Sequence, residues 1–199
     1  MARTLRTLIL PLALMLAACG TAEPGPSPDG VDMRGSTVGG GFTLTNNDGG
    51  ETSWSDFDGQ YRMVYFGFTS CPAICPTDVL NMSQGLERFE EANPDLAGEV
   101  TPIFVSVDPE RDSVEALDEF VGNFHPRLVG LTGDPEALDK VQQTFGVSSM
   151  KLEPDETGFY DMQHSIFVTL FDPAGEPLGI LPSDKGADAI AAELEGWVR

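Results

Sequence analysis

The hydrophobic positions of this chain follow two periods, which predict a mixed fold of strands and helices after residue 41. Short apolar or alternating runs bounded by glycine, proline and asparagine predict strands. The expected strands cover residues 42–45, 51–54, 61–68, 100–107, 128–131, 165–171 and 177–181. The first two strands flank a glycine-rich turn, and the last two flank an Asp-Pro-Ala-Gly turn, so each pair predicts a hairpin.

Apolar residues spaced three or four positions apart predict four helices between and after these strands. The first covers 76–91, and the last covers 187–197. Asp112 and Glu115 form a capping box that predicts a helix running to about Phe124. Asp134, followed by Pro135, starts the next helix, and Gly146 ends it.

This order of elements predicts an α/β sheet with an antiparallel edge. It suits a thioredoxin-like fold with an N-terminal β-hairpin and an insertion before the last β-hairpin. Functional sites in such sheets lie beyond the carboxyl ends of the strands. We therefore look for the site in the loop that follows residues 61–68.

The N-terminal segment has the pattern of an export signal. Two arginines precede an apolar run from Leu8 to Ala18. The run is shorter than the roughly 20 apolar residues that span a membrane, and it is typical of a signal peptide. It ends in Leu-Ala-Ala-Cys19, which resembles the bacterial lipoprotein signal. We expect a signal peptide over 1–18 and a lipid on Cys19; the alternative is an ordinary secretory signal with an incidental cysteine.

Residues 19–41 are expected to form the lipidated N-terminus and a flexible tether. Three prolines and a Gly-Gly-Gly run interrupt this segment, and it offers almost no apolar side chains to bury. The folded domain is then expected over 42–199. A lipid-anchored domain outside the cytoplasm, on a bacterial membrane of the cell envelope, fits this organisation.

Charge and cysteine count narrow the function classes. The chain has 199 residues, with 32 acidic and 11 basic side chains, and its formal net charge is −21. Such a chain repels phosphates, so we expect no nucleic-acid partner and no binding to anionic lipid headgroups. Three cysteines are too few for a disulfide-built scaffold but enough for one site. We expect a monomer.

Two of the cysteines, Cys71 and Cys75, lie in the loop after the strand at 61–68. Pro76 has no N–H and fits the first helical position, so we expect Cys75 at the helix cap and Cys71 in the turn before it. The positive end of the helix would lower the pKa of both thiols. Two thiolates on a short loop form a soft, chelating site that suits Cu(I), with zinc as the common competitor.

A third ligand is expected from His164, which directly precedes the strand at 165–171. In a thioredoxin-like fold the start of this strand faces the cysteine loop, so the imidazole would lie beside the thiols. The alternative is a core histidine bonded to backbone. The other histidine, His125, lies beside a proline in a loop and is expected to be solvated.

Four separated segments, in the same order, resemble the Sco/SenC family of copper-binding proteins in cytochrome c oxidase assembly. They are Tyr65-Phe-Gly-Phe-Thr-Ser-Cys71-Pro-Ala-Ile-Cys75-Pro-Thr-Asp78, Ser106-Val-Asp108-Pro-Glu-Arg111-Asp112, Gly130-Leu-Thr-Gly133, and His164 followed by Asp172-Pro-Ala-Gly175. The resemblance spans roughly residues 42–199. We expect Asp108 and Arg111 mainly to shape their loop and cap the next helix.

The resemblance implies a thioredoxin-like domain that binds copper, as Cu(I) or Cu(II), through Cys71, Cys75 and His164. It also implies delivery of copper, or reduction of target cysteines, at the copper centre of oxidase subunit II or of another copper protein. Two positions depart from the family pattern. Ala73 and Gln163 stand where members often have an acid, and an acid beside the histidine would orient the imidazole.

Three functions remain open at this point. The first is a copper chaperone, a binding protein without turnover. The second is a thiol–disulfide oxidoreductase of the cell envelope, in which Cys71 and Cys75 form a redox disulfide. The third is a peroxiredoxin-type peroxidase, which fits less well because Pro72 stands where that class has an activating threonine. A structural disulfide is the simplest alternative, although a proline-flanked loop at a helix start is a poor place for one.

Overall fold

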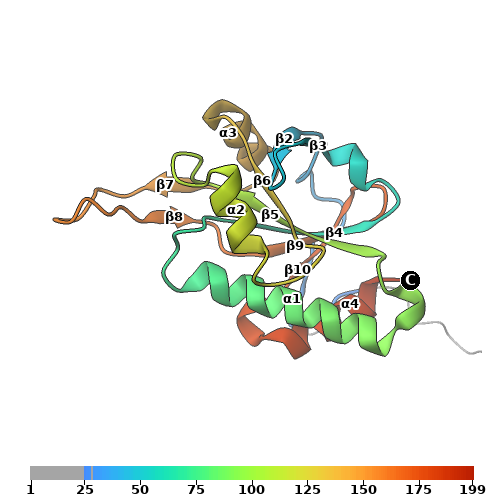
Figure 1. The fold of residues 1–199 in the computed structure, drawn as a ribbon. Helices are drawn as coiled ribbons and strands as arrows, with labels where there is room; N and C mark the ends of the chain where they lie inside the picture. The colour runs from blue at the N-terminus through green and yellow to red at the C-terminus, as the bar shows by residue number, and fades with distance from the viewer. Residues whose placement is uncertain (1–24, 28) are drawn as a thin grey trace, which may run out of the picture.

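The computed structural model describes residues 25–27 and 29–199, and the predicted signal peptide and Cys19 lie outside these residues. An eight-stranded sheet crosses the described chain in the order β1-β10-β9-β4-β5-β6-β2-β3 (Figure 1). The strands are β1 Val31–Asp32, β2 Thr43–Asn46, β3 Glu51–Ser53, β4 Tyr61–Gly67, β5 Val100–Ser106, β6 Val129–Thr132, β9 Val168–Phe171 and β10 Pro177–Leu181. Strands β4, β5 and β6 are parallel, while β9 pairs with β4 and β2 pairs with β6 in antiparallel directions.

Four α-helices pack around this sheet. They are α1 Ile74–Ala92, α2 Val114–Val121, α3 Pro135–Thr144 and α4 Ala187–Trp197. The two longest, α1 and α4, lie side by side below the sheet in the view of Figure 1. Short 3-10 turns cover Trp54–Phe57, Pro94–Leu96 and Ser183–Lys185. None of the helices that the structure describes combines the length and the hydrophobicity that crossing a membrane requires.

Strands β4 and β5 form the centre of the core because their side chains are buried on both faces. Every residue of β5 is buried, and only Tyr61 of β4 keeps partial exposure. Phe68, which directly follows β4, is also fully buried. Burying one phenylalanine stabilises a fold by roughly 2–3 kcal/mol. The near-continuous apolar runs of the sequence are therefore explained by helices and loops that cover both faces of these strands.

Most predicted elements are confirmed, but both ends of α2 differ from the prediction. The expected capping residue of α2, Asp112, does not cap it: Ser113 does, and its hydroxyl accepts a hydrogen bond from the Ala116 N–H. Asp112 is instead buried and turned toward the cysteine loop. The helix also ends at Val121 rather than at Phe124. By contrast, Asp134 caps α3 as predicted, accepting from the Ala137 N–H.

The expected insertion before the last hairpin forms a second, two-stranded sheet. Its strands are β7 Ser149–Lys151 and β8 Met162–His164, which pair antiparallel. We refer to residues 149–164 as the arm. Figure 1 shows the arm extending away from the main sheet at the left of the view. The strand expected from residue 165 begins only at Val168, because residues 165–167 connect the arm to β9.

The segment expected to be a flexible tether differs from that expectation in the part that the structure describes. Strand β1 adds to the sheet edge by pairing with β10. The Met33 N–H donates to the Leu178 carbonyl, and the Gly39 N–H donates to the Thr144 carbonyl. The Arg34 guanidinium also lies 5.1 Å from the centre of the Trp197 ring. Backbone hydrogen bonds to an open sheet edge need few apolar side chains, so hydropathy gave no sign of this contact.

Candidate metal centre

Two neighbouring loops carry most of the candidate site. Strands β4 and β5 run in parallel, and Gly67 pairs with Ser106 at their carboxyl ends. The Val107 N–H continues the pairing by donating to the Gly67 carbonyl at 2.8 Å. The cysteine loop and the loop that follows β5 therefore leave the sheet side by side, at the edge where sites of α/β sheets are expected.

Cys75 does not lie where the proline suggested, whereas Cys71 lies in the turn before the helix as expected. Helix α1 begins at Ile74 with Ala73 as its N-cap, so Cys75 is the second helical residue rather than the cap. Pro76 fits the third position equally well, because the first four N–H groups of a helix have no partner within the helix. The Cys75 N–H donates to the Cys71 sulfur at 3.3 Å. This contact holds Cys71 over the start of the helix.

The two thiols differ in exposure. Both are free cysteines; Cys75 is completely buried, whereas Cys71 is half-buried. Burial raises the pKa of the Cys75 thiol well above its ordinary value. The sequence argument predicted a lower pKa from the helix terminus, and for Cys75 that prediction is wrong because desolvation penalises the thiolate more strongly.

His164 ends β8 and faces the cysteines. Its Nε2 lies 3.4 Å from the Cys75 sulfur, and its Nδ1 lies 2.8 Å from the Ser165 carbonyl oxygen. Because a carbonyl oxygen only accepts, Nδ1 carries the proton of the neutral ring, and the Nε2 lone pair points toward the sulfur. Burial lowers the pKa of His164, which favours the neutral form that binds metals.

Aromatic rings surround the imidazole. The rings of Tyr65 and Phe68 both meet His164 nearly at right angles, with ring centres 6.3 and 5.8 Å away. The Tyr65 hydroxyl donates to the Asp78 carboxylate at 3.2 Å. Asp78 is buried one helical turn beyond Cys75, and burial raises its pKa. Sequence reasoning gave Tyr65 and Asp78 no role, although the spacing of three from Cys75 places Asp78 on the same side of α1.

A pocket of about 460 Å³ opens over this cluster. It is lined by Cys71, Pro72, Ala73, Ile74, Leu152, Asp161, Met162, Gln163, His164 and Ile166. The side chains in this pocket that could bind a soft metal include the Cys71 thiol and the His164 imidazole, and the rest of the wall is mostly apolar. Within residues 25–27 and 29–199, no group of three or more Cys, His, Asp or Glu side chains is already arranged to hold a metal ion. The close pair is Cys75 with His164, and Cys71 shares the pocket with His164.

His125 belongs to a different region. Contrary to the expected solvation, it is buried, and its Nδ1 accepts a hydrogen bond from the Arg127 N–H at 3.1 Å. Its Nε2 lies 3.9 Å from the Glu90 carboxylate, near the far end of α1. Burial lowers its pKa. Fifteen helical residues separate Glu90 from Cys75, a span of about 22 Å, so His125 has no route to the thiols.

The family comparison covers nearly all of the chain that the structure describes. The model of the protein family described as SCO1/SenC matches residues 31–199 of the chain. The chain belongs to the SCO1/SenC family. It is 38% identical over 164 residues to the human protein named "Protein SCO1 homolog, mitochondrial", covering 81% of this chain and 53% of that protein. The chain thus spans about half the length of the curated relatives it matches.

Solved structures of SCO1/SenC proteins share the fold. The structure titled "Bradyrhizobium japonicum ScoI with copper bound" matches with a TM-score of 0.73 at 32% identity, covering 81% of this chain and 99% of that chain. BsSco, described as a member of the Sco family of cytochrome c oxidase assembly proteins with a disulfide switch, matches with a TM-score of 0.63 at 22% identity, covering 83% and 96% of the two chains.

The thioredoxin-like fold predicted from the order of elements is confirmed. The thioredoxin domain of a Bacteroides vulgatus thiol–disulfide oxidoreductase matches this chain with a TM-score of 0.56 at 21% identity, covering 83% of this chain and 98% of that chain. This likeness concerns the fold alone.

Proposed function

We propose that this SCO1/SenC protein binds one copper ion through Cys71, Cys75 and His164 and serves cytochrome c oxidase assembly. The observation that carries the proposal is the 3.4 Å approach of His164 Nε2 to the Cys75 sulfur, with Cys71 in the pocket of the same imidazole. Thiolates and a neutral imidazole are soft and borderline ligands, which suit Cu(I) and also accept Cu(II). The ScoI protein that this chain resembles has been seen with copper bound.

Copper is cargo in this proposal. The pocket is open to a partner, and Cys71 is the more exposed of the two sulfurs, so it is the ligand that a partner's thiolate reaches first. A stepwise exchange of ligands would then move copper to the copper centre of oxidase subunit II or to another copper protein. Alternatively, the two thiols reduce a target disulfide: they give two electrons and two protons and become a Cys71–Cys75 disulfide.

Membrane attachment is a separate part of the proposal. We infer that residues 1–18 are removed and that a lipid on Cys19 anchors the protein to a bacterial membrane, with the domain outside the cytoplasm. The support is the short apolar run that ends in Leu-Ala-Ala-Cys19. A Cys19→Ser variant should lose lipid labelling; membrane attachment with residues 1–18 still present would contradict the lipid anchor.

A thiol–disulfide oxidoreductase remains the second candidate. The observation that favours it is the contact between the Cys75 N–H and the Cys71 sulfur, which holds the two cysteines together without a metal. The two functions differ in what they require. Rapid turnover of disulfide substrates in the absence of copper would favour the oxidoreductase.

The deciding experiment is a Cu(I) competition titration of the reduced and the disulfide-oxidised protein. Oxidation removes both thiolate ligands, so the oxidised form should take up little copper, and reduction should restore one equivalent. X-ray absorption should show two sulfurs and one nitrogen. Equal uptake by both forms would exclude a site built on Cys71 and Cys75.

The two histidines provide a matched control for the third ligand. His164→Ala should weaken Cu(I) binding by at least about 10- to 100-fold, the range found when even a supporting residue of a metal site is lost. His125→Ala should leave copper affinity unchanged, although the loss of its buried hydrogen bond costs about 1–3 kcal/mol of stability. Wild-type affinity in His164→Ala, or a nitrogen signal that disappears in His125→Ala, would overturn the assignment.

A further inference from the structure

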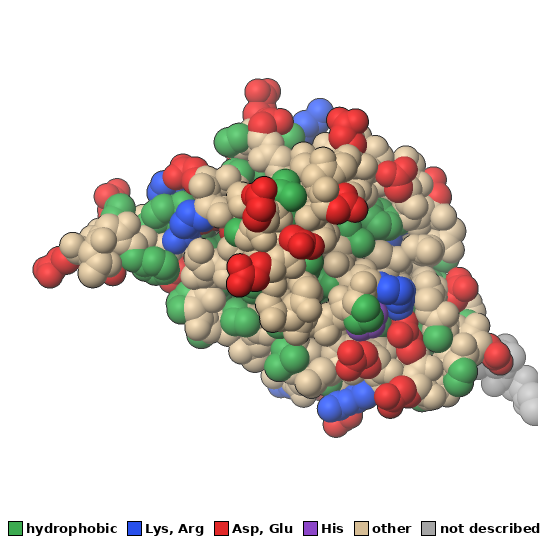
Figure 2. All heavy atoms as spheres, in the orientation of Figure 1, with side chains coloured by type: hydrophobic (Ala, Val, Ile, Leu, Met, Phe, Trp, Pro, Cys, Tyr) green, Lys and Arg blue, Asp and Glu red, His purple; other side chains and the backbone are tan. Residues whose placement is uncertain are grey.

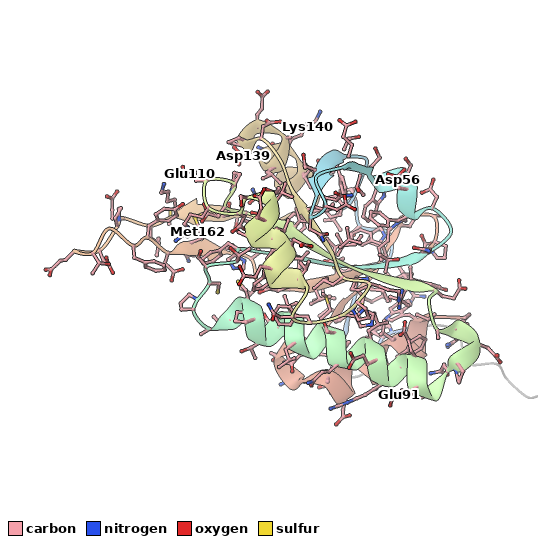
Figure 3. All side chains as sticks on the ribbon, in the orientation of Figure 1. Asp56, Glu91, Glu110, Asp139, Lys140 and Met162 are labelled. Carbon is pink, nitrogen blue, oxygen red and sulfur yellow. The ribbon has the colours of Figure 1, made fainter. Side chains whose placement is uncertain are left out.

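The arm that carries His164 is attached to the domain by very few polar contacts. Apart from the contacts of His164, every hydrogen bond and ion pair between the arm and the rest of the described chain comes from the loop between β5 and α2. The donors and acceptors on that loop are Asp108, Glu110 and Arg111. Figure 3 shows Glu110 on this loop and Met162 on β8 at the base of the arm. The sequence argument expected Asp108 and Arg111 mainly to shape their loop and cap the next helix. They do contact each other within the loop, but Ser113 caps the helix, and the contacts with the arm were not expected.

Arg111 makes the central contact with the arm. Its Nη1 donates to the Tyr160 carbonyl oxygen at 2.8 Å, and its guanidinium lies 3.6 Å from the centre of the Tyr160 ring. The Arg111 Nε donates to Asp108 Oδ2 at 2.5 Å, while the Tyr160 hydroxyl donates to Asp108 Oδ1 at 2.8 Å. Asp108 is only 3% exposed. The three residues thus form a closed ring of contacts in which one buried carboxylate holds both partners.

The same loop also holds the cysteine segment. The Asp112 carboxylate accepts from the Thr69 N–H at 3.1 Å, from the Thr69 hydroxyl at 2.7 Å and from the Ser106 hydroxyl at 2.5 Å. Thr69 lies two residues before Cys71. Residues 106–112 therefore touch both segments that supply the proposed copper ligands.

The Phe68 ring lies between the Arg111 guanidinium and the His164 imidazole. The guanidinium lies 5.4 Å from the centre of the Phe68 ring, and Phe68 meets the His164 ring edge-on. Along the arm, Tyr160 lies four positions before His164, just ahead of β8. A shift of the arm at Tyr160 would accordingly displace His164.

We propose that residues 106–112 fix the position of the cysteine segment relative to the arm, and that Arg111 is the positioning residue that keeps His164 opposite the cysteine pair. This inference rests on the proposed copper site. Arg111 does not touch the metal position; it acts through Tyr160 and Phe68. Arginine suits this task because its planar group stacks on a ring and donates hydrogen bonds in a fixed fork at the same time.

The test is a double-mutant cycle between Arg111→Met and His164→Ala on the full protein, read by Cu(I) competition titration. Arg111→Met should weaken Cu(I) binding about 10-fold when His164 is present, as loss of a supporting contact does. It should have no effect on the residual affinity of His164→Ala, since the ligand it positions is then gone. X-ray absorption of Arg111→Met should show a weaker nitrogen contribution with both sulfurs retained.

Two further variants keep the test decisive. Tyr160→Phe keeps the ring under the guanidinium but removes the hydroxyl bond to Asp108, and it should weaken copper binding by less than Arg111→Met. Glu110→Gln removes the exposed ion pair with Lys151 on the same arm and should change nothing, as exposed pairs contribute little. If Arg111→Met fails to fold, the double-mutant cycle is measured with Tyr160→Phe and His164→Ala instead.

The outcomes separate this inference from the proposed function. Wild-type copper affinity in Arg111→Met and in Tyr160→Phe, with a clear loss in His164→Ala, overturns the positioning role of Arg111 and leaves the copper site intact. An equal loss from Arg111→Met with His164 present and with His164→Ala shows that Arg111 acts on the fold or on charge, and it also overturns the positioning role. Wild-type affinity in His164→Ala overturns both the proposed ligand set and the positioning role.

Discussion

The cysteine segment and the arm meet at one pocket, but they are held in different ways. Residues 68–78 leave a central strand and enter the longest helix, and Phe68, Cys75 and Asp78 are buried in or beside the core. The arm has a two-stranded sheet of its own and stands away from the main sheet. Figure 2 shows hydrophobic side chains gathered at its base, at the left of the view. Hydrophobic side chains in and beside the arm remain exposed: Met150 55%, Leu152 38%, Phe159 42% and Ile166 51%.

This difference shows how a site can combine a fixed half with an adjustable half. The sulfur ligands are part of the cooperative core, so their position is determined by the same packing that stabilises the fold. The imidazole is carried by an element whose polar contacts to the domain, apart from those of His164 itself, come from one loop. Elements with few buried contacts open locally at a lower free-energy cost than the core. In the proposed copper site, His164 therefore lies on the half that opens more readily, and the cysteine pair lies on the half held by the core.

The largest expected effect tests whether the cysteine segment belongs to the core. Phe68→Ala should lower the free energy of unfolding by about 3–5 kcal/mol, because the side chain is fully buried. Phe159→Ala, at an exposed position on the arm, should change it by about 0.5 kcal/mol or less. Urea unfolding followed by circular dichroism measures both variants. Similar losses in the two variants would contradict the contrast between the two regions.

Hydrogen exchange gives the next test. The paired amides of β7 and β8 should exchange through local opening, at a free energy at least about 2 kcal/mol below that of the β4 and β5 amides. This corresponds to exchange about 30-fold faster. Mass spectrometry of peptides covering the two sheets measures it. Equal protection in the arm and the central strands would mean that the arm opens only with the whole domain.

Thiol labelling distinguishes the two sulfurs within the fixed half. Iodoacetamide should modify Cys71 at least about 10-fold faster than Cys75, because Cys71 is half-buried while burial raises the pKa of Cys75 and keeps it protonated. Peptide mapping of the reduced protein at short reaction times gives the ratio. Labelling in urea, which exposes both thiols, is the control and should bring the two rates together.

The smallest effect concerns the residue that starts α1. Ala73 is the N-cap but provides no side-chain hydrogen bond. Ala73→Asp should stabilise the protein by about 0.3–1 kcal/mol, because the acid meets the positive end of the helix. It gains no capping hydrogen bond, since the Cys75 N–H already donates to the Cys71 sulfur and Pro76 has no N–H. Ala92→Asp, at the other end of α1, should destabilise it by a few tenths of a kcal/mol. Urea unfolding of both variants tests the sign; stabilisation by Ala92→Asp would contradict it.

The sequence predicted the fixed half of the site better than the adjustable half. Strand β4, the cysteine loop and α1 are contiguous, and their hydrophobic periodicity and proline signals are local, so Cys71 and Cys75 could be found directly. His164 was placed from the fold, and its approach to Cys75 is confirmed. The ligand set itself stays a prediction. The start of α1 was wrong by two residues because a proline is tolerated throughout the first turn.

Contacts between distant segments could not be predicted in this way. Asp108 and Arg111 come from one loop and Tyr160 from the arm about 50 residues later, and no local pattern in the chain indicates that they meet. Asp112 was assigned to a helix cap because its spacing from Glu115 fits one, but the neighbouring Ser113 fulfils that role. His125 shows the same limit, since a proline-flanked histidine is usually exposed and here is buried by the packing of α1 against its loop.

Strand β1 and the contact just before it affect how far the domain can lie from the proposed membrane anchor. The Gly25 N–H already donates to the Gly196 carbonyl, so the folded body begins near residue 25 rather than near Phe42. With the proposed lipid on Cys19, six residue steps connect anchor to body, a maximum span of about 22 Å; twenty-three steps, up to Phe42, would have allowed about 83 Å. If Cys19 is lipidated as proposed, the shorter connection keeps residue 25 within about 22 Å of the lipid surface. A partner that receives copper would then meet a domain that rests close to the membrane instead of one that ranges far above it.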